Sequence, residues 1–540
     1  MLSLLKNLRA FAASFTRTEK VLFVLISLYA GFAMGGHQLF FTEYPLQKVF
    51  VKILILLLHS TWLAVVGFAF LYFTHFTSNW LKTRNKTQNA PKSILKLYTI
   101  FLSILIGWWL LYFIGFFPAT MSTDSFVEWK QAIGMEPLHD LHPILYSLIM
   151  RVLTTVWLSP AVVSLFQIVA LAAVMSSFLV FLYKAGIPFI WLLILAILTA
   201  IMPVNGIMVV TIWKDILFCT CMVWLTLTIA EIVSNVYIFN QRTTLVCLFF
   251  SLLGVALLRH NGVLTTYAVS LALILLALKT KRRNLIITPA LFLLVFFIYK
   301  KVLMPRVWKV APVASAFQTT PLMHGMAAVL VHNGKLSNEA RAEMEKILPE
   351  ARWKELYNPY SADEYLYGSN TPFIENLSAV PTSKVMSLYV KTFIDNPFLI
   401  TRDRLSGCEL LWNINQGDGP STYAWEPDMQ ENDLGFKQPD NGLRKVLMGM
   451  LKFAGRALDP LTRRMGIYNV FLLLIFLYMF KQRKLSWLIF LPIFATNVSL
   501  VLGMTFPALR YGYYLPLLFG LLWLLSVSGI VTRDFKKPLK

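Results

Sequence analysis

Residues 118–146 read PATMSTDSFVEWKQAIGMEPLHDLHPILY and directly follow a strongly apolar segment that ends at Phe117. The stretch gathers ionisable side chains in a chain that elsewhere runs for tens of residues without a carboxylate: Asp124, Glu128, Glu136, His139, Asp140 and His142. Such groups are costly beside lipid and occur mostly where they have a function. The stretch therefore predicts a chemical site at the mouth of a membrane helix, and with it a fold of membrane-spanning helices.

The composition of the whole chain indicates a polytopic membrane protein. Of the 540 residues, 57% are hydrophobic and only 14% are charged, and the mean hydropathy is +0.63. The net charge is +22, which in a membrane protein collects in cytoplasmic loops and makes nucleic acid a poor candidate partner. The four cysteines show no spacing typical of a disulfide framework.

We predict an all-α polytopic membrane protein with about 12 transmembrane helices, each near the ~20 residues that a bilayer requires. The predicted spans are residues 20–38, 51–75, 96–118, 161–183, 188–208, 212–233, 244–259, 263–279, 285–303, 466–480, 485–503 and 508–530.

Lysine and arginine set the predicted orientation, because cytoplasmic loops are enriched in them. The basic N-terminus, the 82–96 loop, the 279–283 cluster, the 481–484 turn and the 533–540 tail all fall on one side. We therefore expect a multi-pass protein of the cell (plasma) membrane, with both termini cytoplasmic and the active site external.

This orientation requires that residues 142–158 do not cross the membrane. The run is short, has Arg151 in its middle, and is bounded by Pro143 and Pro160. A helix that lies in the membrane interface fits it better than a span.

The chain divides into four predicted regions. These are two N-terminal transmembrane helices and a cytoplasmic loop (1–95), a catalytic transmembrane core (96–303) with an external loop at 119–159, a small α-rich external domain (304–465), and C-terminal helices with a basic tail (466–540). Within the external domain, capped amphipathic patterns predict helices at 337–348 and 383–394.

Charged residues at the external mouths of several helices are expected to converge with the acidic loop on one cavity. They are Lys214-Asp215, Arg259-His260 and Arg510-Tyr511. A single cation there would fit snorkelling to lipid headgroups. Three cations facing an acidic loop fit a site for an anionic lipid phosphate better. Asp215, next to Lys214, has a simpler interpretation as its ion-pair partner.

Asp124 has two interpretations. It can cap a helix, since Ser, Thr and Asp all favour that position, or it can accept the proton of an acceptor hydroxyl during group transfer. Glu128 lies four residues later and shares a helix face with it. Glu128 is interpreted either as a solvated residue or as one that positions the acceptor.

His139 and His142 also have two interpretations. Together with Asp140 they could ligate a metal, but the sequence contains no complete ligand set, so no cofactor is assigned and a divalent metal stays open. Alternatively, His142 offers its imidazole to a phosphate or a sugar hydroxyl, and His139 makes interfacial hydrogen bonds.

The chain resembles the GT-C superfamily of polyprenyl-phosphate-sugar-dependent glycosyltransferases, in particular its protein mannosyltransferase and aminoarabinose transferase branches. The matching elements are Asp124 in the first large external loop, the segment 142–146 (HPILY), and Arg510-Tyr511 near the last span. The sequence departs from the family pattern at Ile144, where a second proline is usual. The resemblance implies that Asp124 is the catalytic base and that basic residues hold the phosphate leaving group.

The resemblance predicts an inverting transfer of a sugar from a polyprenyl-phosphate donor to a cell-surface glycan, a teichoic-type polymer or a lipid. Asp124 is the predicted catalytic residue, and the predicted substrate-binding residues are Glu128, His142, Lys214, Arg259, His260, Arg510 and Tyr511. Two alternatives remain: a transporter or flippase of lipid-linked sugars, and an O-antigen-type polymerase or ligase. In the latter, Arg259 and His260 would matter more than Asp124.

Overall fold

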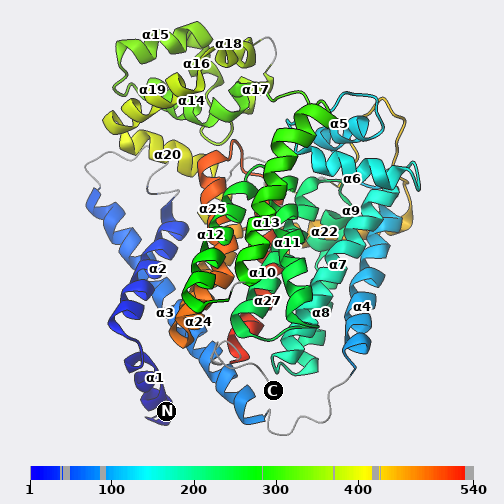
Figure 1. Ribbon diagram of the computed structural model, residues 1–540. Coiled ribbons are helices and arrows are strands. Elements are labelled where there is room, and N and C mark those ends of the chain that lie inside the picture. Colours follow the sequence, from blue (N-terminus) through cyan, green and yellow to red (C-terminus); the bar gives the residue numbers. More distant parts are fainter. Residues whose placement is uncertain are drawn as a thin grey trace.

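The structure is a computed structural model that describes residues 2–36, 39, 49–84, 93–282, 284–368, 371–415, 425 and 427–529. In this part of the chain every regular element is a helix, and extended backbone pairs only in isolated bridges (Figure 1). The prediction of an all-α polytopic membrane protein is confirmed. Of the basic segments that predicted the orientation, the 533–540 tail, Arg283 and part of the 82–96 loop lie outside the described residues.

Among the described residues, ten helical segments are long and apolar enough to cross a membrane. They are α2 (Arg17–Gly36), α3 (Val49–Arg84), α4 (Ile94–Gly115), α7 (Pro160–Lys184), α10 (Lys214–Ser234), α11 (Gln241–Leu258), α12 (Gly262–Thr280), α13 (Asn284–Ile298) with its π-helical continuation η4 (Tyr299–Val307), α24 (Met465–Gln482), and η6 (Lys484–Ser486) with α25 (Trp487–Gly503).

Two predicted spans are broken helices. The segment predicted at 188–208 consists of α8 (Phe189–Ile201) and α9 (Pro203–Val210), which meet at 61° and make an eleventh span if they are counted together. Pro203 begins α9, where its ring cannot continue the preceding hydrogen-bond pattern. The segment predicted at 508–530 contains α26 (Leu509–Gly512) and the 14-residue α27 (Tyr514–Val527).

The short helices α5 (Thr123–Ala132) and α6 (Ile144–Thr154) lie at one end of the bundle, and α1 (Leu2–Ala13) lies at the other (Figure 1). With 11 residues, α6 is about half as long as a helix that crosses a bilayer. Residues 119–159 therefore stay on one face of the bundle. Which face is external in the cell stays a prediction.

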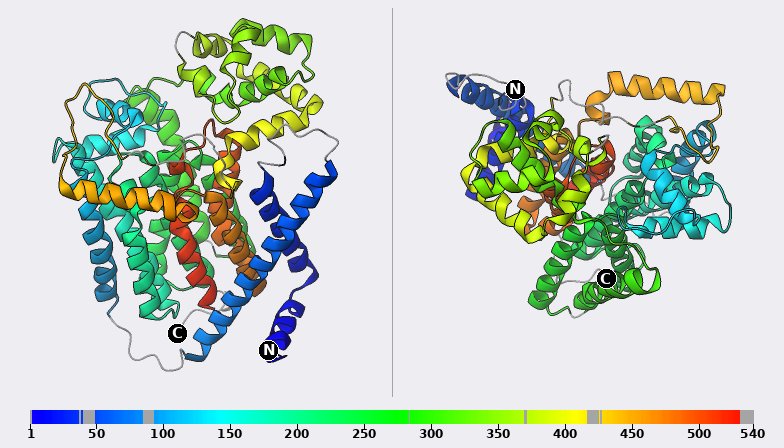
Figure 2. Two further views of the ribbon diagram at one scale, coloured as in Figure 1. Left: turned by 180° about the vertical axis from the view of Figure 1, so that it is seen from behind. Right: turned by 90° about the horizontal axis from the view of Figure 1, so that it is seen from above.

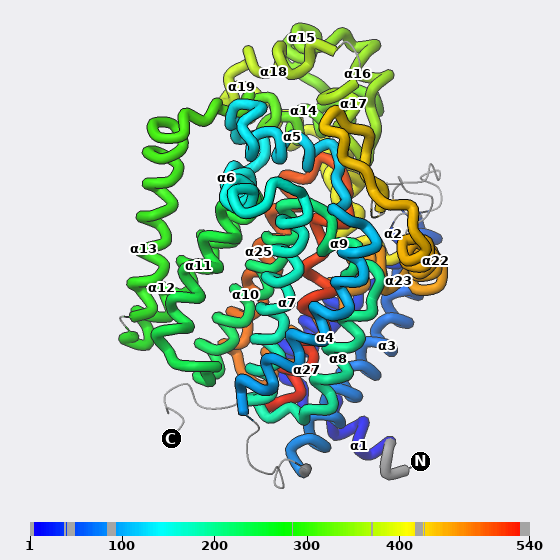
Figure 3. Tube along the Cα trace, turned by 90° about the vertical axis from the view of Figure 1, so that its right-hand side faces the viewer, coloured from blue at the N-terminus to red at the C-terminus, as the bar shows by residue number. Residues whose placement is uncertain are grey.

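The centre of the bundle is α10, which is the most buried of the candidate spans. It packs against α7, α11 and α25 (Figure 3). Because Lys214 is the first residue of α10, the fold brings a cation to the end of its innermost helix. This position determines where the charged residues of the other helices can meet.

The region predicted as one external domain (304–465) separates into two parts. Helices α14 (Ser315–Val331), α15 (Asn338–Ile347), α16 (Glu350–Leu356), α17 (Asp363–Tyr367), α18 (Phe373–Ala379), α19 (Thr382–Asp395) and α20 (Pro397–Gly407) form a domain above the bundle, with its own apolar core around Met326 and Trp353. The predicted helices at 337–348 and 383–394 correspond to α15 and α19. The hydroxyl of Ser337 caps α15 by accepting the N–H of Ala340 at 3.1 Å.

The second part of this region, residues 409–462, packs on the membrane bundle instead. Helix α21 (Glu409–Trp412) contacts α24, and the amphipathic α22 (Gly442–Ala457) contacts α4 and α9. Figure 2 shows α22, in orange, lying across the direction of the spanning helices. The four-residue α23 (Asp459–Thr462) then connects it to α24.

Candidate functional site

The connection before α5 is joined to the connection before α10 by one parallel bridge between Thr120 and Thr211. The N–H of Thr120 donates to the carbonyl of Val210, and the N–H of Ile212 donates to the carbonyl of Thr120, both at 3.0 Å. The Ser125 hydroxyl adds a 2.6 Å bond to the carbonyl of Ile212. The bridge therefore places the first turn of α5 beside the first turn of α10.

The cap of α5 is Ser122, so Asp124 is not the capping residue. The N–H of Ser122 donates to the Ser125 hydroxyl at 3.1 Å, and the indole N–H of Trp213 donates to the Ser122 hydroxyl at 2.9 Å. Because these residues complete the helix end, the Asp124 carboxylate makes long-range contacts instead.

Asp124 lies between a guanidinium and an imidazole. Arg510 donates to its Oδ2 atom at 2.8 Å, and the Nε2 atom of His142 lies 3.7 Å from its Oδ1 atom. Burial alone would raise the pKa of Asp124, but the positive charges of Arg510 and Lys214 outweigh burial and hold the pKa well below its usual range. Asp124 is therefore ionised while Arg510 is its partner.

Glu128 is buried and paired, so its interpretation as a solvated residue is wrong. Its side chain is 1% exposed, and its Oε1 atom accepts from the Lys214 ammonium at 2.8 Å. Burial raises the pKa of Glu128 to about 7, although Lys214 acts in the opposite direction. The second oxygen, Oε2, is buried without a hydrogen-bond partner.

His142 lies between Asp124 and Lys214, the partner of Glu128. The Lys214 ammonium donates to Nδ1 of His142 at 3.0 Å. Burial, together with the charge of Lys214, lowers the pKa of His142 to about 3. The ring is therefore neutral at physiological pH. Because Nδ1 accepts from Lys214, the ring proton is on Nε2, which faces Asp124.

Asp215 pairs with Arg259 and not with its neighbour Lys214, so the expected pair with Lys214 is wrong. Its Oδ1 atom accepts from Nη1 of Arg259, and Nε of Arg510 lies 3.8 Å from its Oδ2 atom. Adjacent residues on a helix point in different directions, which separates Asp215 from Lys214.

Two aromatic rings cover the arginines. The guanidinium of Arg259 lies 4.1 Å from the centre of the Tyr511 ring, and that of Arg510 lies 5.0 Å from the centre of the Trp213 ring. Stacking of this kind suits guanidinium groups. Tyr511 thus joins the site through Arg259.

His260 lies at the edge of this group. Its Nε2 atom is 3.0 Å from the backbone carbonyl of Asp140, and the Asp140 carboxylate accepts from Lys300 at 2.9 Å. His139 contacts the Gln131 amide at 2.9 Å. The described residues include no group of three or more His, Cys, Asp and Glu side chains that could hold a metal ion.

The structure thus brings the predicted residues Asp124, Glu128, His142, Lys214, Arg259, Arg510 and Tyr511 into one cluster and leaves His260 at its edge. The carboxylates of Asp124, Glu128 and Asp215 match the three cations Lys214, Arg259 and Arg510. An anion that enters this cluster would therefore compete with the carboxylates for the cations.

A segment near residue 430, which the sequence did not predict, holds the outer side of α5. Gln430 accepts from the Thr123 hydroxyl at 2.6 Å, Asp433 accepts from Lys130 at 2.9 Å, and the Gln438 amide donates to the carbonyl of Ala119 at 3.1 Å. These partners are about 300 residues apart, so no local pattern reveals them.

The domain of α14–α20 also reaches the site. The N–H of Ala362 donates to the carbonyl of Thr505 at 2.9 Å, in the segment that leads to Arg510. The neighbouring Asp363 has a raised pKa, caused first by burial and further by the negative charge of Asp124. The charge of Asp124 is therefore felt by a carboxylate of the domain.

No family model, curated protein or solved structure matches the chain. The resemblance to the GT-C superfamily therefore stays a prediction.

Proposed function

We propose that the chain is a membrane glycosyltransferase that moves a sugar from a polyprenyl-phosphate donor to a hydroxyl of a cell-surface glycan, a teichoic-type polymer or a lipid. The observation that carries the proposal is the position of Asp124, whose carboxylate lies 2.8 Å from Arg510 and 3.7 Å from His142. A carboxylate, two cations and a neutral imidazole at one helix mouth are the groups that such a transfer requires.

Lys214 and Arg510 bind the donor phosphate in this proposal. Each is paired with a carboxylate in the cluster, Lys214 with Glu128 and Arg510 with Asp124, so the phosphate takes the place of these partners. Arginine offers a planar fork to phosphate oxygens, and lysine a compact charge. Both cations then stabilise the negative charge that develops on the leaving phosphate.

Phosphate binding would also activate the base. Arg510 contributes to the depressed pKa of Asp124. When the phosphate neutralises Arg510, the pKa of Asp124 rises towards physiological pH, where a general base is most effective. Donor binding therefore precedes deprotonation of the acceptor.

The transfer step proceeds in one displacement. The acceptor oxygen forms a bond to the anomeric carbon as Asp124 takes the hydroxyl proton. The bond between that carbon and the phosphate oxygen breaks, and its electron pair leaves with the polyprenyl phosphate. Attack from the side opposite the phosphate inverts the anomeric configuration. The domain of α14–α20, which contacts the segment before Arg510, positions the acceptor.

The test compares wild type with Asp124→Asn in membranes that contain a panel of polyprenyl-phosphate sugars, and follows the release of polyprenyl phosphate. Loss of the base is expected to lower turnover about 10²- to 10⁴-fold. Asp440→Asn is the matched control, because this carboxylate is 76% exposed and pairs with the exposed Lys445 rather than with a residue of α5; its turnover should match wild type. Equal turnover by Asp124→Asn at equal protein level would overturn the proposal.

The alternatives give different results in the same membranes. A transporter of lipid-linked sugars would move the donor across the bilayer without releasing polyprenyl phosphate. A polymerase or ligase of the O-antigen type would lose activity in Arg259 and His260 variants and keep it in Asp124→Asn. Either result would replace the transferase assignment.

A further inference from the structure

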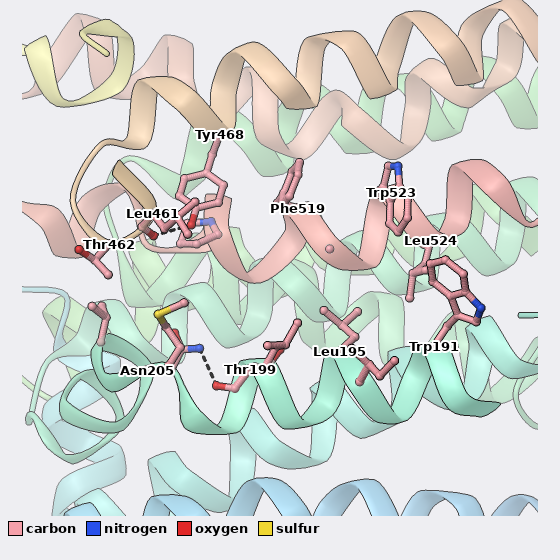
Figure 4. Close-up of a pocket in the computed structure, with 16 residues that line it drawn as sticks. Trp191, Leu195, Thr199, Asn205, Leu461, Thr462, Tyr468, Phe519, Trp523 and Leu524 are labelled. Carbon is pink, nitrogen blue, oxygen red and sulfur yellow. Dashed lines mark hydrogen bonds between the residues drawn. The ribbon is translucent and has the colours of Figure 1, made fainter. Parts of the chain in front are cut away.

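An apolar groove of about 390 Å³ lies between α8 and α27, with residues of α9, α23 and α24 at one end. Figure 4 shows the two helices running side by side, with Trp191, Leu195 and Thr199 on α8 and Phe519 and Trp523 on α27. The groove lies within the apolar helices of the bundle. No residue of the charged cluster lines it.

The groove is formed by one face of each helix. Its lining residues on α8 and α27 recur at three- and four-residue intervals: Trp191, Ile194, Leu195 and Leu198, and Pro516, Phe519, Gly520 and Trp523. This spacing defines a single helix face. Ile194 is 49% exposed and Leu198 is 53% exposed, so the groove opens sideways towards lipid.

Several of the polar side chains that line the groove have partners in the protein, among them Asn205, Thr462 and Tyr468. The Asn205 amide donates to the carbonyl of Thr199 at 2.8 Å, and its oxygen accepts from the Tyr513 hydroxyl at 2.9 Å. The hydroxyls of Thr462 and Tyr468 donate to backbone carbonyls. These groups offer little to a polar ligand, so the lining fits a hydrocarbon chain.

The groove has a near end and a far end with respect to the charged cluster. At the far end the rings of Trp191 and Trp523 lie 6.0 Å apart. At the near end Asn205 is bonded to Tyr513, which follows Arg510 by three residues. Asn205 also lies in α9, an eight-residue helix about 12 Å long, whose C-terminal residue bonds to Thr120 beside the cluster.

We propose that this groove holds the hydrocarbon chain of the donor lipid while its phosphate lies at Lys214 and Arg510. The proposal rests on the proposed function for the identity of the lipid. The near end of the groove is connected to the segment that carries Arg510 by the bond between Asn205 and Tyr513, whereas the far end is bounded by aromatic rings. A lipid with its phosphate at the cluster therefore places its chain along α8 and α27.

The test fills the groove without touching the cluster. Ile194→Trp adds bulk to a lining residue towards the far end, and Ile197→Trp is the matched control, because Ile197 is 41% exposed on the same helix and does not line the groove. Both proteins are reconstituted in nanodiscs. Their binding of undecaprenyl phosphate and of the much shorter geranyl phosphate is measured by displacement of radiolabelled undecaprenyl phosphate.

Ile194→Trp is expected to weaken undecaprenyl phosphate binding at least tenfold and to change geranyl phosphate binding less than twofold. Ile197→Trp should match wild type with both probes. Unchanged binding of undecaprenyl phosphate by Ile194→Trp would overturn the proposal. So would an equal loss with both probes, because it would indicate a disturbed fold or cluster.

A second measurement identifies the occupant directly. A photoreactive phenylalanine at position 519 is irradiated in nanodiscs that contain phosphatidylglycerol and undecaprenyl phosphate. Capture of undecaprenyl phosphate supports the proposal; capture of phosphatidylglycerol alone, or of neither lipid, overturns it. Neither measurement requires sugar transfer. If the groove binds undecaprenyl phosphate but the protein transfers no sugar, the proposed lipid site is supported and the proposed glycosyltransferase function is rejected.

Discussion

Arg510 donates to the Asp124 carboxylate at 2.8 Å although 386 residues separate them in the chain. The bond joins α5, the short helix that follows α4, to α26, the short helix before α27. Every spanning helix from α7 to α25 lies between the two residues in the chain. The charged cluster is therefore complete only when the first and last parts of the bundle have packed together.

The planar geometry of the Arg510 guanidinium should matter more for donor binding than its charge. Arg510→Lys keeps a cation but loses the geometry that reaches both Asp124 and Asp215. We expect the KM for the polyprenyl-phosphate donor to rise about tenfold, which corresponds to about 1.4 kcal/mol of binding free energy, and kcat to fall less. Steady-state kinetics in proteoliposomes would measure both. Arg341→Lys, at an exposed pair in the domain, is the control; equal kinetics for both variants would contradict the role of Arg510.

Glu128 should make donor binding depend on pH. Its pKa of about 7 means that acidification through neutral pH protonates the carboxylate and removes a negative charge beside Lys214. Donor phosphate should therefore bind more tightly as the pH falls from 8 to 6, by about tenfold. In Glu128→Gln the charge is absent at every pH, so its donor affinity should be high and constant across this range. The measurement is the donor Kd from pH 6 to 8, and a pH dependence that survives in Glu128→Gln would refute this assignment.

The Asp215–Arg259 pair should stabilise the fold. Both side chains are buried, and loss of one partner leaves the other charge without compensation, at a cost of about 3–5 kcal/mol. Asp215→Asn is therefore expected to lower the thermal unfolding midpoint in detergent, and the double variant with Arg259→Gln should recover part of the loss. If the double variant is no more stable than Asp215→Asn alone, the unpaired Arg259 is not the cause.

Local sequence was sufficient to predict ten of the twelve expected spans, which the described residues form as long apolar helical segments, and to identify charged residues that meet at their ends. An apolar run predicts a buried or spanning helix wherever it occurs, and Lys214, Arg259 and Arg510 stand out because they end such runs. Side-chain direction was not predictable. Glu128 and Asp215 found partners 86 and 44 residues away, and their burial follows from the packing of α5 and α10, which no local pattern encodes.

Breaks within apolar segments were harder to predict than the segments themselves. Pro203 marks the bend between α8 and α9, yet a proline can begin, kink or end a helix, and the 188–208 run has no charged residue on either side of this proline. The bend is what places Asn205 at the end of the groove. Long-range bonds such as Gln430 to Thr123 lack even this degree of local signal.

The Thr120–Thr211 bridge has a mechanical consequence. It ties the beginnings of α5 and α10 together through backbone hydrogen bonds in both directions, so we expect Asp124 and Lys214 to keep their relative positions. Opening of the cluster to a bulky headgroup then has to come from the opposite wall, where Arg510 is carried by the short α26 and the segment before it contacts the domain. We therefore expect the part of the cluster on α5 and α10 to stay fixed and the part that contains Arg510 to move.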